Sequence, residues 1–208
     1  MQLAMESGGE NEIGVWVSGF YGSGKSSFTK YLGLAFDDQR TIDGTPFLKY
    51  LQDRLHKPQT KALLSTVAQR FPAAVVMLDL ASEMLAGATM EDVTTVLYFK
   101  VLKWAGYSDN LVVADLERHL ERDGHMPAVE ARIADQFPGK KWTDVHNSPL
   151  LVSALIPKIA HDFYPDLFPA TSSFIAETKG WYKSQEQQVQ EMIDIVREKS
   201  GKQNIIFI

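Results

Sequence analysis

Apolar side chains along the chain fall into short continuous runs near its two ends and into helical spacing between them. The three strongest runs are Ile13–Val17, Ala73–Leu80 and Ile205–Ile208. A short run rich in apolar and β-branched residues predicts a strand covered on both faces, which is typical of a parallel sheet. We therefore predict three strands of a mostly parallel sheet.

Apolar residues recur at intervals of three and four positions behind the first run. Phe28, Tyr31, Leu32 and Ala35 follow this spacing and predict a helix that packs one face on a sheet. Similar spacing predicts helices over residues 47–55 and 58–70, a helical stretch over residues 89–174, and a long helix over residues 179–200.

These elements predict an α/β fold with a large helical insertion. The expected organisation is a flexible lead-in over residues 1–12, a core over 13–88, a helical insertion over 89–200, and the start of a further strand over 201–208. Gly201 is a natural stop for the long helix that precedes this last strand.

A glycine-rich segment joins the first predicted strand to the first predicted helix. Its residues are Gly19, Phe20, Tyr21, Gly22, Ser23, Gly24, Lys25 and Ser26. They match G-x-x-x-x-G-K-[ST], the phosphate-binding loop known as Walker A. Because a strand precedes the match and an amphipathic helix follows it, the segment predicts nucleotide binding. The plainer alternative is a Gly/Ser-rich turn that contains a lysine.

The residue types of this loop suit a triphosphate. Gly19, Gly22 and Gly24 permit positive φ and close approach of the backbone, so that loop N–H groups point at an anion. The helix that follows adds unpaired N–H donors. Lys25 is expected to reach the β- and γ-phosphates as the catalytic cation, and the Ser26 hydroxyl to ligate Mg²⁺. The predicted cofactors are therefore ATP and Mg²⁺.

An acid at the end of a second buried strand normally completes such a site. Asp79 is a candidate, but Leu80 and Ala81 follow it and Glu83 comes four positions later, which favours an ordinary strand-end aspartate. The run Ile205–Ile208 is typical of the stretch before this acid, yet no acid follows. We therefore expect a fragment cut inside that strand. The alternative is an intact small protein whose last strand ends there.

Composition narrows the class of protein. The 208 residues carry a formal net charge of −5, which argues against a freestanding nucleic-acid binder, and they include no cysteine. The longest apolar runs are far shorter than the roughly 20 residues of a membrane span. The polar first residues are not a secretory signal. Together these features predict a soluble cytoplasmic protein without a membrane partner.

Other constellations are less specific. The five histidines lack zinc-ligand spacing. Two segments interleave basic and aromatic residues, as a single-strand nucleic-acid surface does, but solvated lysines beside a core tryptophan explain them equally well; they are Lys100–Trp104 and Lys140–Trp142. Three arginines could serve a neighbouring subunit by stabilising negative charge there; they are Arg118, Arg122 and Arg132. Nothing in the sequence favours one of them over the others.

The segment Ile13–Phe28 resembles the opening of the large P-loop ATPase of BREX phage-exclusion systems (the BrxC/PglY group). The segment Gly201–Ile208 resembles the approach to the Walker B motif of the same family. The resemblance implies an additional-strand (AAA+-like) P-loop ATPase, longer than this chain and cytoplasmic, in a multiprotein antiviral complex associated with DNA methylation and exclusion. The positions it carries over are Gly19, Gly22, Gly24, Lys25, Ser26 and Ser27. The Walker B pair, the sensor residues and any arginine finger have no counterpart.

Three functions follow as expectations. The first is a BREX-type ATPase that binds MgATP here and hydrolyses it only in the full-length protein, with other BREX proteins as partners. The second is a P-loop kinase of a small metabolite. The third is an interaction module that senses nucleotide without turnover. A sheet edge left open by the missing strands also predicts self-association.

Overall fold

The fold is described from a computed structural model, which defines residues 15, 17–79, 93–174 and 183–208. The chain forms two compact units, one comprising Met1–Met77 with Ile208 and the other Leu78–Phe207. The predicted lead-in, Glu83 and the first turn of the predicted long helix lie outside the described residues.

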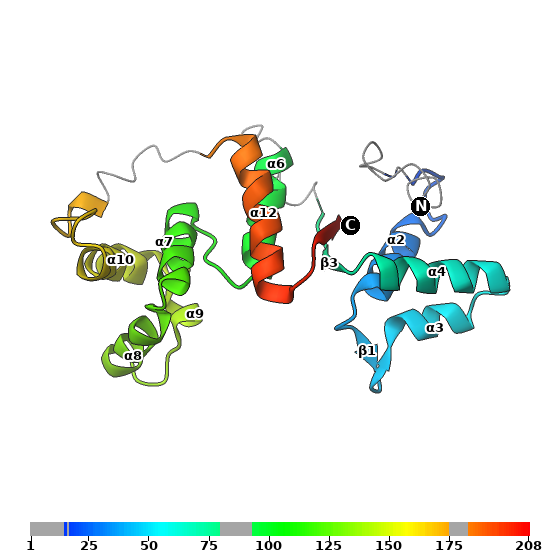
Figure 1. The fold of residues 1–208 in the computed structure, drawn as a ribbon, viewed down its shortest axis with the longest axis horizontal. Helices are drawn as coiled ribbons and strands as arrows, with labels where there is room; N and C mark the ends of the chain where they lie inside the picture. The colour runs from blue at the N-terminus through cyan, green and yellow to red at the C-terminus, as the bar shows by residue number, and fades with distance from the viewer. Residues whose placement is uncertain (1–14, 16, 80–92, 175–182) are drawn as a thin grey trace. The chain divides into compact units, whose positions relative to one another are not determined.

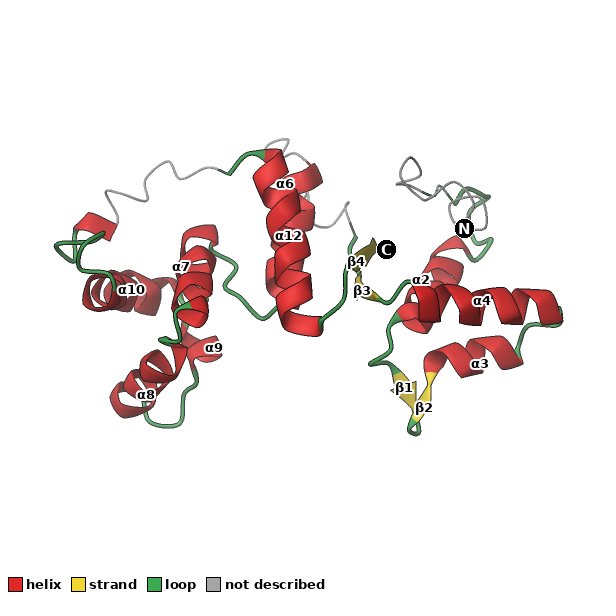
Figure 2. Ribbon diagram, in the orientation of Figure 1, coloured by secondary structure: helices red, strands yellow, loops and turns green. Residues whose placement is uncertain are grey.

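Helices dominate the described part of the first unit (Figures 1 and 2). In chain order its elements are α2 (Lys25–Phe36), β1 (Thr41–Ile42), β2 (Thr45–Pro46), α3 (Phe47–Asp53), α4 (Pro58–Arg70) and β3 (Ala73–Val76). The two helices predicted over 47–55 and 58–70 are confirmed as α3 and α4.

A tight hairpin and a hydrogen-bonded pair of helices follow α2. Asp43 and Gly44 both have positive φ, 49° and 75°, which suits a two-residue hairpin turn between β1 and β2. Pro58 occupies the first turn of α4, where its missing N–H costs no hydrogen bond. The Gln52 amide on α3 donates to the Ser65 hydroxyl of α4 at 2.5 Å and so joins the two helices.

The helix α2 packs on β3 through a close backbone approach at Gly33. A Cβ added at Gly33 would lie 2.5 Å from Cδ1 of Ile208, 3.0 Å from Cε of Met77 and 3.4 Å from Cγ1 of Val75. The Ile208 N–H donates to the Val76 carbonyl at 3.0 Å. The absence of a side chain at Gly33 therefore lets α2 sit against β3 and the last residue of the chain.

The second unit is built from helices, with α6 and α12 packed side by side (Figure 1). Its described elements are α6 (Val93–Trp104), α7 (Leu111–Arg122), α8 (Met126–Gln136), α9 (Trp142–Val145), α10 (Pro149–Phe163), α12 (Gln185–Ser200) and β4 (Asn204–Phe207). The Asn110 side chain accepts from the Val112 and Val113 N–H groups and caps α7. Ser184 and Gln187 form a capping box at α12, and Gly201 ends that helix with a φ of 69°.

The core of the second unit lies among α7, α8, α9 and α10. Its most deeply buried side chains have an exposed fraction of 1% or less; they include Leu120, Val129, Ile133, Val145, Ile156 and Ile159. Pro157 lies inside α10, which continues to Phe163. These residues come from several helices, so the core of this unit forms from contacts between elements rather than within one of them.

The prediction of an α/β fold with a P-loop NTPase core and a mostly parallel sheet is wrong. The described part is mostly helical (60%), and its strands form two sheets of only two strands each. A central parallel strand needs neighbours on both edges and cover on both faces. Val15 lies outside any strand and is 86% exposed, and β3 includes only four of the eight residues in the run Ala73–Leu80.

The buried face predicted for the first helix is also largely wrong. Phe28 and Tyr31 are 58% and 51% exposed, whereas the buried residues of α2 are Gly33, Ala35 and Phe36. The predicted face would need a sheet beneath it. In the structure α2 instead contacts the short strand β3 through Gly33. The strand predicted over Ile205–Ile208 is confirmed as β4, shifted by one residue.

Among the described residues, no helix combines the length and apolar character that crossing a membrane requires.

Candidate functional site

The glycine-rich loop takes a compact form directly before α2. Gly22 and Gly24 have φ values of 77° and 84°, the left-handed region that glycine adopts without strain. The Ser23 N–H donates to the Phe20 carbonyl at 3.1 Å and closes a turn. Gly19 lies so close to this turn that an added Cβ would be 2.8 Å from the Ser23 hydroxyl. Gly22 and Gly24 therefore need glycine for their backbone conformation, whereas a side chain at Gly19 would meet only the rotatable Ser23 hydroxyl.

Lys25 is the first residue of α2 and folds back over the loop. Its ammonium group donates to the Phe20 carbonyl at 2.8 Å, the same oxygen that accepts from the Ser23 N–H. In the described part of the chain, no carboxylate lies within ion-pair distance of Lys25. The charge of Lys25 is therefore not neutralised by a neighbouring acid there.

The N-terminus of α2 leaves its donors available. Gly24 is the N-cap residue, no side chain caps the helix there, and the first turn contains no acidic residue. The Phe28 N–H makes the first helical bond, to the Gly24 carbonyl at 2.9 Å. Ser26 and Ser27 are exposed at this end. Their N–H groups lie in the turn where helix donors lack intrahelical partners and the helix dipole is positive.

The predicted loop residues are thus brought together in one exposed segment. The side chains of Phe20 and Tyr21 are 91% and 106% exposed, so the loop tip carries two aromatic rings in solvent. Asp79, the weaker acid candidate, is exposed beyond the end of β3 and belongs to the second unit.

The second unit holds a largely buried group of charged side chains that sequence patterns did not reveal. We call it the Lys183 cluster; its members are Tyr98, Asp115, Arg118, Lys183 and Glu191. The Lys183 ammonium lies 2.5 Å from Oδ1 of Asp115 and 2.8 Å from Oε2 of Glu191. Arg118 forms an ion pair with Glu191, and the Tyr98 hydroxyl donates to Oε2 of Glu191 at 2.5 Å. Burial, and then the bond to Glu191, raises the pKa of the Tyr98 phenol far above its ordinary value.

A similar arrangement recurs nearer the surface with Lys199. The Lys199 ammonium lies 2.6 Å from Oε1 of Glu121 and 4.7 Å from the centre of the Tyr107 ring, while the Tyr107 hydroxyl donates to Oε2 of Glu121 at 2.6 Å. Burial raises the pKa of the Glu121 carboxyl, but the hydrogen bonds from Lys199 and Tyr107 outweigh it and hold that pKa below its ordinary value. Both arrangements fasten α12 to other helices of this unit.

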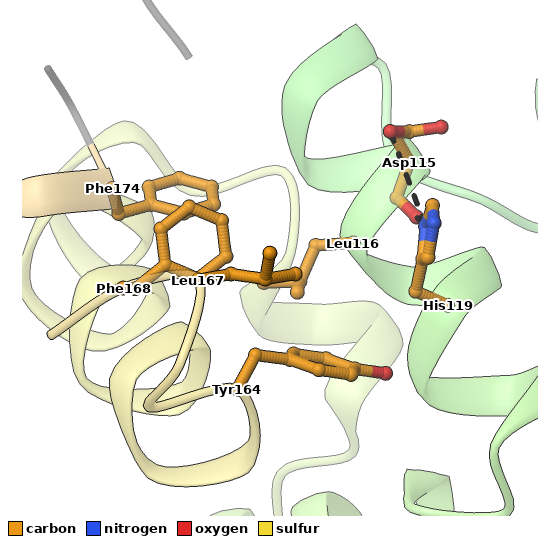
Figure 3. Close-up of a pocket in the computed structure, with 7 residues that line it drawn as sticks. All are labelled: Asp115, Leu116, His119, Tyr164, Leu167, Phe168 and Phe174. Carbon is orange, nitrogen blue, oxygen red and sulfur yellow. Dashed lines mark hydrogen bonds and ion pairs between the residues drawn. The ribbon is translucent and has the colours of Figure 1, made fainter. Parts of the chain in front are cut away.

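The polar side chains that line two cavities beside the Lys183 cluster already have hydrogen-bond or ion-pair partners. One, of about 360 Å³, is lined by Tyr98, Asp115, His119, Lys183 and neighbouring residues of α7 and α12. A smaller crevice of about 40 Å³ lies among α7 and the turn after α10 (Figure 3). In that view Phe168 and Phe174 pack edge to face, while the His119 ring donates through Nδ1 to the Asp115 carbonyl at 2.8 Å.

A buried carboxylate lies between α7 and α9. Glu117 is 3% exposed and accepts from Nε1 of Trp142 at 2.5 Å, from the Ser108 N–H at 2.8 Å, and bonds to Nδ1 of His146 at 2.6 Å. Although Ser, His and Glu lie together, the Ser108 hydroxyl donates to the His146 backbone carbonyl at 2.9 Å. This is a structural network and not a nucleophile activated by a base.

The remaining candidates have structural partners. Trp142 is 4% exposed in the core, so its ring is not available for stacking with a base. Arg122 contacts Asp123 at 3.5 Å, and Arg132 contacts Asp162 at 2.7 Å. The described residues contain no group of three or more side chains suited to a metal ion.

No protein-family model matches the chain, and no solved structure matches it significantly. A function must therefore be inferred from the side chains themselves.

Proposed function

We propose that the chain binds ATP with Mg²⁺ through the loop Gly19–Ser27. The observation that carries the proposal is the conjunction of three features in one exposed segment. Gly22 and Gly24 take left-handed conformations, the N-terminus of α2 has no side-chain cap or acid, and Lys25 has no carboxylate partner among the described residues. Together they offer N–H donors and a mobile positive charge to a polyphosphate.

Each residue has a separate role in this proposal. The loop N–H groups and Lys25 would hold the β- and γ-phosphates once the Lys25 ammonium leaves the Phe20 carbonyl. The exposed Ser26 hydroxyl would ligate Mg²⁺. Binding needs no more than these groups. Hydrolysis also needs a group that positions water, and we assign it to the full-length protein.

We further propose that this protein is a cytoplasmic BREX-type ATPase that acts with other proteins of such a system. The similarity of the two terminal segments supports this proposal. Self-association is part of it, and the exposed aromatic side chains of the first unit favour it; they are Phe20, Tyr21, Phe28 and Tyr31.

A thermal-shift titration with MgATP tests the binding proposal. At about 100 times the dissociation constant, a bound ligand adds roughly 2.7 kcal/mol to the free energy of unfolding. We expect that gain in the parent chain and its loss in Lys25→Ala. Lys30→Ala is the matched control, because Lys30 is an exposed lysine of the same helix outside the motif. The proposal fails if millimolar MgATP stabilises none of the three, or stabilises Lys25→Ala as much as the parent.

A phosphate-release assay separates the two enzymatic alternatives. Free phosphate produced without any added acceptor would favour an ATPase over a small-molecule kinase. Saturable binding without turnover would favour the nucleotide-sensing module. That module is a rival because binding needs only the groups of the loop, whereas hydrolysis also needs a group that positions water.

A further inference from the structure

The helix pair α3–α4 carries a concentration of positive charge that the net charge of the chain conceals. Residues 47–70 include five basic residues and one acidic residue, a formal charge of +4. Because the whole chain carries −5, the rest of it carries −9. The basic residues are Lys49, Arg54, Lys57, Lys61 and Arg70. A local surplus of this kind is the electrostatic footprint of a polyanion partner.

None of these five side chains forms an ion pair with a carboxylate in the part of the chain that the structure describes. Arg54 donates to a backbone carbonyl, that of Tyr50, at 3.1 Å. Lys57 is the N-cap residue of α4 and Lys61 lies in the first turn of that helix, which contains no acidic residue. Positive charge is unfavourable at this end of a helix, because the helix dipole is positive there.

Two of the lysines line an open groove between α3 and α4. Lys49 comes from α3 and Lys61 from α4, and the groove measures about 670 Å³. Gln52, Ser65 and Gln69 add polar groups to its walls, and one carboxylate, Asp53, also lines it. The bond from Gln52 to Ser65 fixes the two helices relative to each other, so the groove is a formed feature of this unit.

We propose that this groove binds the phosphodiester backbone of a nucleic acid. Lysine ammonium groups hold phosphates as point charges and gain affinity by releasing the counterions condensed on the nucleic acid. A lysine already paired with a carboxylate would first have to break that ion pair. Charge complementarity favours a polyanion, because two lysines without a carboxylate partner among the described residues line the groove against one aspartate. Gln52, Ser65 and Gln69 add hydrogen-bond donors for phosphate oxygens. The proposal is independent of nucleotide binding, since no residue of the Gly19–Ser27 loop lines the groove.

Fluorescence anisotropy with labelled 20-base DNA, single-stranded and duplex, tests the proposal in the absence of nucleotide. We expect a dissociation constant on the order of micromolar at low salt, weakening linearly on a double-logarithmic plot as salt rises from about 50 to 200 mM. Lys49→Glu/Lys61→Glu should weaken binding at least tenfold and reduce the salt slope by about two, roughly 0.9 for each phosphate that is no longer neutralised.

The matched control is Lys158→Glu/Arg197→Glu, which makes the same change in net charge at two exposed cations of the second unit that lie outside both candidate nucleic-acid segments. It should leave the salt slope unchanged. Lys49→Gln/Lys61→Gln, without reversed charges, provides a second test if the first variant folds poorly, as judged by circular dichroism.

The proposal is overturned if the parent chain binds no DNA at about 50 mM salt, or if both double variants lose affinity equally, since net charge alone would then account for binding. It is also overturned if polyglutamate competes as well as DNA does, which would indicate an acidic protein partner. Capture by anionic phosphatidylserine vesicles in preference to DNA would indicate a membrane surface and would likewise reject it.

Discussion

Cations on the surface of the first unit and in the interior of the second unit differ in whether they pair with carboxylates. In the first unit, Lys25 bonds only to a backbone carbonyl, and the five cations of α3–α4 have no carboxylate partner among the described residues. In the second unit, Lys183 and Lys199 each contact carboxylates at 2.5–2.8 Å. The first arrangement leaves charge available to a ligand, whereas the second uses charge to hold helices together.

Burial explains the difference. The Asp115 and Glu191 side chains are 11% and 18% exposed, so an unpaired charge there would lose hydration without compensation. A solvated lysine on α3 or α4 loses little hydration and needs no partner. Pairing in the buried part of the second unit is therefore a structural requirement. In the first unit Arg40 pairs with Asp37 at 3.1 Å, so the cations without such a partner, among them Lys25 and those of α3–α4, mark the surfaces where a ligand is to be sought.

The largest expected effect removes the buried carboxylate of the second unit. Glu117→Ala should lower the free energy of unfolding by about 3–5 kcal/mol, because the Trp142 indole, the His146 ring and the Ser108 N–H all lose their partner in the core. Urea unfolding followed by far-UV circular dichroism measures the loss. A loss below about 1 kcal/mol would show that water reaches these groups. Burial would then not explain why the charged groups of the second unit are paired.

A matched set of lysine variants compares the units directly. Lys183→Ala should cost about 2–3 kcal/mol, because it takes a cation away from two nearly buried carboxylates. Lys199→Ala should cost about 1 kcal/mol or less, because Glu121 is 45% exposed and water can replace the ammonium. Lys25→Ala should stay within about 0.5 kcal/mol.

Urea midpoints at constant m-value provide the measurement for all three lysine variants. The comparison between the units breaks down if Lys25→Ala destabilises the protein as much as Lys183→Ala does.

Local features of the fold were predictable from the sequence, and the features that depend on distant contacts were not. The glycine loop, α2, α4 and the stop at Gly201 follow from glycine, proline and helical periodicity within a few residues. The prediction of a parallel sheet was wrong because the run Ala73–Leu80 suits a strand but does not reveal whether other strands flank it. Of this run, only Ala73–Val76 forms a strand.

The charged sites show the same division. The loop Gly19–Ser26 is a contiguous motif and could be read directly. The Lys183 cluster joins residues 68 positions apart, Asp115 and Lys183, and no local spacing brings them together. The five basic residues between positions 47 and 70 can be counted in the sequence, but the net charge of −5 gives no sign of this local surplus. Which cations are paired with a carboxylate can be seen only from the ion-pair distances in the structure.

Stability is also expected to depend on alkaline pH, through a residue of the second unit. Burial, and then the bond to Glu191, raises the pKa of Tyr98 above its ordinary 10.0. The folded state therefore keeps a proton that the unfolded state loses. The contribution of Tyr98 to the free energy of unfolding is complete below about pH 10. It declines as pH rises further, by up to about 1.4 kcal/mol per pH unit.

Tyr98→Phe should reduce that decline between about pH 10 and 11 in urea titrations. The remaining decline belongs to Tyr107 and Tyr164, whose pKa is also raised by burial and by hydrogen bonds to carboxylates. Tyr21→Phe should leave it unchanged, because the Tyr21 ring lies in solvent at the loop tip. The pair sharpens the contrast between the units, since the same loss of a hydroxyl is compared in a buried network and on an exposed loop. An equal flattening in both variants would mean that the alkaline decline reflects general charge repulsion, and Tyr98 would then have no special part in it.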